Sequence, residues 1–155
     1  MKEVGTLFCR SFPSYQGQCT ICSQRLTAEL LHIHNAFHQG QYSQTVKFDP
    51  TPFSDQNKLP ARVLALRALV AVGQSDDVIA DLEGEEDVPD LAAVKVYAQY
   101  AAGKHSSAMT AMERLIKVSP ENAVVQVLGG TLLQAEGRSE EALALLAKHQ
   151  NNLEA

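Results

Sequence analysis

The chain has 155 residues, of which 45% are hydrophobic and 20% are charged, and its formal net charge is −5. This length and composition are typical of one globular domain with a hydrophobic core, and they exclude a disordered, collagen-like or membrane-spanning protein. The negative charge argues against nucleic acid as a partner, because proteins that bind phosphate backbones gather lysine and arginine on one face.

The first segment, residues 1–26, mixes Cys, Ser, Pro, Gln and Gly and shows no sustained helical period. We predict that it is a disordered leader. It holds the three cysteines of the chain, and this odd, clustered set does not predict a disulfide framework. The chain begins without an apolar run of signal-peptide length, which indicates a cytosolic protein.

A zinc site in this leader is an alternative that stays open. Cys19 and Cys22 form a CxxC pair, with Cys9 upstream and His32 downstream, and thiolates with imidazoles are ligands of tetrahedral zinc. Only the CxxC pair has the tight spacing of a zinc finger. We therefore interpret the cysteines as free thiols and expect neither a metal nor another cofactor.

From Thr27 onward, apolar residues recur at helical spacing in blocks of about ten to fourteen residues, as in amphipathic helices. Gly, Pro or acidic residues separate the blocks, and none alternates as a half-buried strand does. Residues 27–155 are therefore predicted to form an all-α domain. The predicted helices fall into four pairs: 27–38 with 41–48, 60–72 with 75–82, 90–102 with 105–117, and 122–136 with 139–149.

Four glycines divide these pairs, namely Gly40, Gly73, Gly103 and Gly137. Their spacings of 33, 30 and 34 residues are close to the 34-residue period of tetratricopeptide hairpins. Each glycine is predicted to end a helix in the left-handed conformation. The predicted fold is a tetratricopeptide-like solenoid of about four helical hairpins with a concave side that holds a partner chain.

Small residues support close packing within the later hairpins. Ala108 and Ala142 each follow the hairpin glycine by five residues, where a small side chain lets the second helix approach the first. The same place holds Thr45 and Val78 in the first two hairpins, so those pairs are expected to be looser. The Gly129-Gly130 pair is likewise interpreted as a close helix contact, because no strand precedes it as in a phosphate-binding loop.

Two connecting segments are polar. Residues 49–57 are predicted to be a linker with two prolines. Residues 81–90 contain six acidic residues, and we interpret them as a solvated loop before a helix that Pro89 opens. A docking patch for a cationic partner is the alternative for this loop.

Candidate binding residues lie on the first helix of each hairpin. In the third hairpin, Leu91, Val94 and Ala98 are predicted to pack inward, whereas Ala93, Tyr97 and Tyr100 turn toward the concave side. Three further residues lie at equivalent offsets before their glycines. The candidate partner-binding set is Phe37, Arg67, Tyr97, Tyr100 and Gln134. Catalytic motifs such as a P-loop, GxSxG or HExxH do not occur, so we expect no enzymatic activity.

Three runs of the sequence resemble a known family. They are ELLHIHNAFHQGQY (29–42), LPARVLALRALVAVGQSDDVIADLEG (59–84) and VPDLAAVKVYAQYAAGK (88–104). Over residues 27–155 the chain resembles the fungal form of the epsilon subunit of coatomer, the COPI vesicle coat. The resemblance implies a structural, non-enzymatic coat protein that holds the C-terminal part of the alpha subunit. It also implies a cytoplasmic protein, peripheral on Golgi membranes and COPI vesicles, that serves retrograde Golgi-to-ER and intra-Golgi transport without nucleic acid or a small-molecule substrate.

Members of this family begin just before the first of these runs and continue beyond the end of this chain. Residues 1–26 are therefore expected to be an atypical leader. The chain is expected to represent an N-terminal portion, with Leu143, Leu145 and Leu146 exposing apolar surface toward a further repeat. A generic repeat adaptor that grips a peptide or partner helix is the alternative function.

Overall fold

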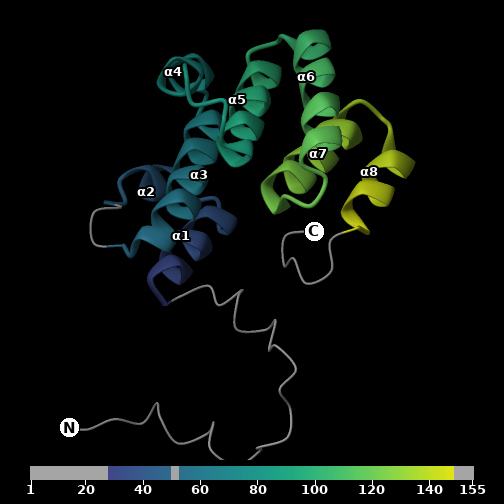
Figure 1. Ribbon diagram of the computed structural model, residues 1–155. Helices are drawn as coiled ribbons and strands as arrows, with labels where there is room; N and C mark the ends of the chain where they lie inside the picture. Colours follow the sequence, from purple (N-terminus) through teal and green to yellow (C-terminus); the bar gives the residue numbers. More distant parts are fainter. Residues whose placement is uncertain (1–27, 50–52, 149–155) are drawn as a thin grey trace, which may run out of the picture.

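The computed structural model describes residues 28–49 and 53–148, and these ranges form helices without strands (Figure 1). The predicted leader, residues 1–26, lies outside the described residues. The helices are α1 (Ala28–His38), α2 (Tyr42–Val46), α3 (Asp55–Ala71), α4 (Ser75–Asp81), α5 (Pro89–Ala101), α6 (His105–Val118), α7 (Ala123–Ala135) and α8 (Ser139–Leu146). The all-α prediction is confirmed.

The helices form four successive hairpins that follow one another across the molecule (Figure 1). The first helices of the hairpins, α1, α3, α5 and α7, contact one another in that order, and we call them the first-helix row. Each second helix packs against its own first helix, and α2, α4 and α6 also pack against the first helix of the next hairpin. This is the arrangement of a helical-hairpin solenoid, as predicted.

The hairpin turns share one hydrogen-bond pattern. At the third turn, Gly103 has a φ of +89°, its N–H donates to the carbonyl of Tyr100 at 3.0 Å, and the N–H of Lys104 donates to the carbonyl of Gln99 at 3.0 Å. This pair of bonds is a Schellman motif, which needs a left-handed residue after the helix. The same pattern occurs at Gly40, Gly73 and Gly137, where φ is +75°, +90° and +77°.

The position five residues after each of these glycines is buried in every hairpin. It holds Thr45, Val78, Ala108 and Ala142. Thr45 fits there because its hydroxyl donates to the carbonyl of Gln41 at 3.1 Å, so the buried polar group is satisfied. The position therefore accepts a side chain larger than alanine in the first two hairpins.

Helix α3 begins earlier than the sequence predicted. Residues 55–57, assigned to the linker, form its first turn, and the amide of Asn57 donates to the hydroxyl of Ser54 at 2.9 Å. The predicted start at residue 60 was therefore too late, and Pro60 lies inside α3. In contrast, Pro89 is the first residue of α5, where its missing N–H leaves no helical bond unmade.

The main core lies between α3, α4, α5, α6 and α7, with smaller clusters between α1 and α3 and between α7 and α8. Leu91, Val94 and Ala98 are buried as predicted. Ala93 is also fully buried, so its predicted place on the concave side is wrong. The reason is that α5 is covered by α3, α4, α6 and α7 together, which leaves little of its circumference open.

The last hairpin packs tightly at the paired glycines. A Cβ on Gly129 would lie 3.1 Å from side-chain carbons of both Ile116 and Leu145, and one on Gly130 would lie 3.0 Å from Leu146. The pair is therefore a close helix contact, as interpreted from the sequence. Leu145 is buried in this contact, which corrects the expectation that it is exposed.

Candidate partner-binding surface

The five predicted binding residues all lie on the first-helix row. Phe37 is on α1, Arg67 is on α3, Tyr97 and Tyr100 are on α5, and Gln134 is on α7. Gln134 is exposed, and the other four are partly buried. Each hairpin thus contributes at least one residue to the set.

Phe37 and Arg67 come together between the first two hairpins. The guanidinium carbon of Arg67 lies 4.7 Å from the centre of the Phe37 ring, a cation–π contact. Tyr42 packs its ring against the same phenylalanine with centroids 5.5 Å apart and an interplanar angle of 65°. This packing orders an arginine and two aromatic side chains, the residue types that most often anchor protein interfaces.

Tyr100 is hydrogen-bonded to the fourth hairpin. Its hydroxyl donates to Oε1 of Glu136 at 2.7 Å, and its ring meets His105 with centroids 4.3 Å apart and an angle of 85°. The hydrogen bond to Glu136 raises the pKa of the Tyr100 phenol above its ordinary value, because a nearby carboxylate favours the protonated form. Tyr100 thus links α5 to the end of α7, and Tyr97 packs against the main core.

The acidic loop after α4 is tied to neighbouring helices by ion pairs. Arg62 contacts Asp81 at 3.2 Å and Glu85 at 2.6 Å, while Lys95 contacts Glu86 at 2.5 Å. The bond from Lys95 lowers the pKa of Glu86. Asp81 lies in α4 and Asp90 in α5, so the loop itself, residues 82–88, holds four of the six acidic residues. Two of them, Glu85 and Glu86, are ion-paired to α3 and α5. The alternative of a docking patch for a cationic partner stays a prediction.

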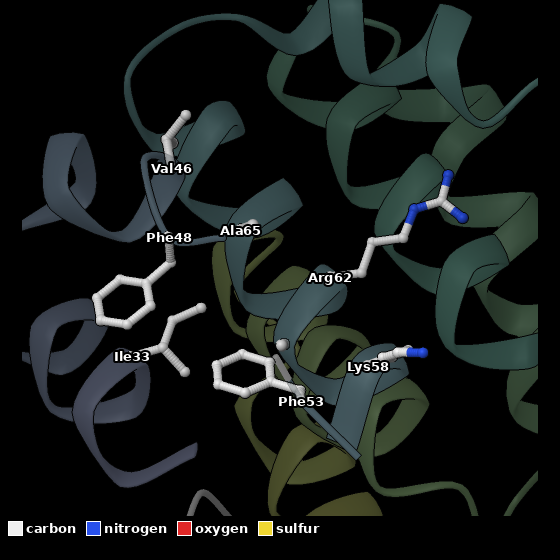
Figure 2. A pocket seen from close by; sticks show the side chains of 8 residues that line it. Ile33, Val46, Phe48, Phe53, Lys58, Arg62 and Ala65 are labelled. Carbon is white, nitrogen blue, oxygen red and sulfur yellow. The ribbon is translucent and has the colours of Figure 1, made fainter. Parts of the chain in front are cut away.

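An apolar cleft of about 390 Å³ lies between α1, α2 and α3. Figure 2 shows Ile33, Phe48 and Phe53 on one side of α3, while the charged ends of Lys58 and Arg62 point toward the other. Val46, Ala61 and Ala65 complete the lining. Sequence reasoning missed this cleft, because its lining comes from several segments whose relative placement the helical period does not encode.

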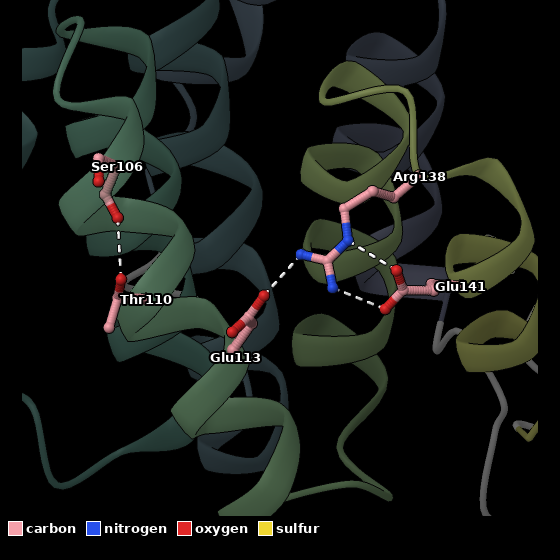
Figure 3. A network of polar contacts seen from close by, with 5 residues as sticks. All are labelled: Ser106, Thr110, Glu113, Arg138 and Glu141. Atoms are coloured by element: carbon pink, nitrogen blue, oxygen red, sulfur yellow. Dashed lines mark hydrogen bonds and ion pairs between the residues drawn. The ribbon is translucent and has the colours of Figure 1, made fainter.

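Arg138 joins α6 to α8 through two carboxylates (Figure 3). Its Nη1 contacts Glu113 at 2.6 Å, while Nε and Nη2 form a bidentate pair with Glu141 at 2.7 and 2.6 Å. These bonds raise the pKa of Arg138 and lower the pKa of Glu141. The network fixes the last turn of the described solenoid and therefore has a structural role.

The zinc alternative receives no geometric support in the described ranges. Three or more His, Cys, Asp or Glu side chains do not gather there in a way that could hold a metal ion. Cys9, Cys19 and Cys22 lie outside the described residues. His32 packs its ring against Phe48 with centroids 5.1 Å apart. Within residues 28–49 and 53–148, the structure also contains no helix that is long and apolar enough to span a membrane.

Comparison with known proteins gives one family. A family model described as "Coatomer epsilon subunit" matches residues 26–155. A curated protein of Schizosaccharomyces pombe (strain 972 / ATCC 24843), "Probable coatomer subunit epsilon", is 28% identical over 131 residues, which are 84% of this chain and 42% of that protein. The chain thus spans less than half the length of this relative. No solved structure matches significantly.

Proposed function

Because the chain belongs to the coatomer epsilon subunit family, we propose that it is a structural subunit of the COPI vesicle coat and that it binds the C-terminal domain of the alpha subunit. The single observation that carries the proposal is the family match. It extends over residues 26–155 and so includes every helix of the solenoid. In this role the protein serves retrograde Golgi-to-ER and intra-Golgi transport, and it acts in the cytoplasm and on Golgi membranes through its partners.

The proposed role is binding without turnover. The candidate interface is the first-helix row, because a partner that crosses it meets every hairpin at once. The Phe37–Arg67 contact supports this choice, since two side chains that are already packed lose less conformational entropy when a partner binds. Tyr97 and Gln134 extend the surface toward the last hairpin.

The test is co-expression of this chain with the C-terminal domain of the alpha coat subunit, followed by size exclusion with light scattering. We expect a complex with the mass of one copy of each. Elution of the two proteins apart contradicts the proposal for this chain. Binding of short peptides without binding of the alpha domain favours the generic adaptor instead.

A pair of arginine variants then tests the surface. Arg67→Ala is expected to weaken the complex about tenfold, because arginine anchors commonly contribute 1–2 kcal/mol or more to an interface. Arg114→Ala is the matched control, since Arg114 is an exposed arginine on α6, outside the first-helix row. Equal effects of both changes contradict the assignment of the interface to the first-helix row, even where the complex itself forms.

A further inference from the structure

The first hairpin, α1 with α2, lies outside the main core. The buried residues of the main core extend from Val63 in α3 to Leu132 in α7, and in the part of the chain that the structure describes none of them belongs to α1 or α2. Among the described helices, α1 and α2 contact each other and α3 alone. Helix α3 meets the two groups with different side chains, because Ala61 and Leu64 pack against α1 whereas Val63 and Leu66 join the main core.

The cluster that joins the first hairpin to α3 is small. Its buried members are Leu30, Ile33, Ala61 and Leu64, whereas the main core draws on five helices. The apolar cleft of Figure 2 opens at the same interface, because Ile33 and Ala61 also line it. Side chains that border a cleft have fewer neighbouring atoms, which lowers the dispersion energy of the contact. A segment with few buried apolar contacts opens at a lower free energy than the core does.

The fourth hairpin, at the other end of the solenoid, is joined differently. Val125, Leu128 and Leu132 of α7 are buried members of the main core. The 2.6 Å hydrogen bond between Arg138 and Glu113 also links the fourth hairpin to the third. The fourth hairpin is therefore expected to unfold together with the main core. A place at the end of the solenoid does not by itself account for the separation of the first hairpin.

We propose that the first hairpin is a separate cooperative unit, which undocks from α3 while α3 to α8 stay folded. Helices α1 and α2 have 11 and 5 residues, and isolated helices shorter than about 12–15 residues are marginal in water. Undocking therefore also opens their helical hydrogen bonds. It separates Phe37 from Arg67 and so takes apart that portion of the candidate partner-binding surface. This opening occurs in the chain alone, so the proposal does not rest on the coat function.

Hydrogen exchange of the folded full chain, followed by NMR, tests the proposal. Relative to their intrinsic rates, we expect amides of α1 to exchange at least about tenfold faster than amides of α5. Ile33→Val should speed exchange in α1 by about two- to tenfold, because Ile33 is 1% exposed at the contact with α3. Val94→Ala is the matched variant in the main core. It should speed exchange in α5 about tenfold and leave α1 unchanged, because the main core stays folded when the first hairpin opens.

A measurement without substitutions tests the same distinction. Low concentrations of urea should speed exchange in α5 more steeply than in α1, because undocking exposes less surface than unfolding of the whole chain does. Equal exchange rates in α1 and α5, or equal urea slopes, overturn the proposal, because both results describe a single cooperative unit. Faster exchange in α1 and α5 alike after Val94→Ala contradicts it for the same reason. An unchanged rate in α1 after Ile33→Val also overturns it, because α1 then opens without breaking its contact with α3.

Discussion

Replacing Gly103 by valine tests the turn on which the hairpin repeat depends. Gly103 has a φ of +89°, and a Cβ built on it meets nothing within 4 Å. Space is available, so the cost comes from the backbone conformation. The left-handed conformation costs a residue with a Cβ about 1–2 kcal/mol, and β-branching adds to this. A side chain also lowers the conformational entropy of the unfolded chain, and this effect offsets about 0.4–1 kcal/mol of that cost.

We therefore expect Gly103→Val to lower the free energy of unfolding by about 1–2 kcal/mol and Tm by about 2–8 °C. Thermal and urea unfolding followed by far-UV circular dichroism measure both quantities. Gly103→Asn is the matched control and should lose less stability than Gly103→Val, because asparagine tolerates the left-handed conformation better than valine does. An unchanged Tm for the valine variant, or equal losses for both variants, refutes the reasoning.

Three further predictions concern the last two hairpins. Gly129→Val should lower the free energy of unfolding by about 1–3 kcal/mol in urea titrations, because its side chain overpacks the contact with α6 and α8. Met112→Ala should lower the free energy of unfolding by about 2–5 kcal/mol, because Met112 is fully buried. Val118→Ala is its control and should change the free energy of unfolding by less than about 0.5 kcal/mol, because Val118 is 79% exposed. NMR titration should find the pKa of Glu141 below its ordinary value, and Arg138→Met should return it toward that value. The stability from this bond is present at neutral pH, above the unfolded pKa of glutamate, and is lost as pH falls through the lowered pKa.

The placement of two candidate residues on one helix could be predicted because it depends on local spacing. Tyr97 and Tyr100 lie one turn apart on α5, and both are partly buried. Their partners could not be predicted, since Tyr100 contacts Glu136, 36 residues away. Ala93 illustrates the same limit. Helical spacing assigned it to the face of Tyr97, but four neighbouring helices cover α5 and bury it.

The side-chain contacts that the sequence did not predict are long-range. The bond between Arg138 and Glu113 and the contact between Phe37 and Arg67 each join residues from different hairpins. Their formation depends on the angle between neighbouring hairpins, and that angle results from how the buried side chains fit together.

The sequence by itself determined the all-helical class, the pairing of helices and the positions of the four turns. These features follow from interactions within a few residues, namely the helical period of the apolar side chains and the left-handed conformation that glycine permits. Only the tertiary structure decided the burial of Leu145 and the cleft between α1, α2 and α3. Burial at both places depends on side chains from other helices, which are distant in the sequence.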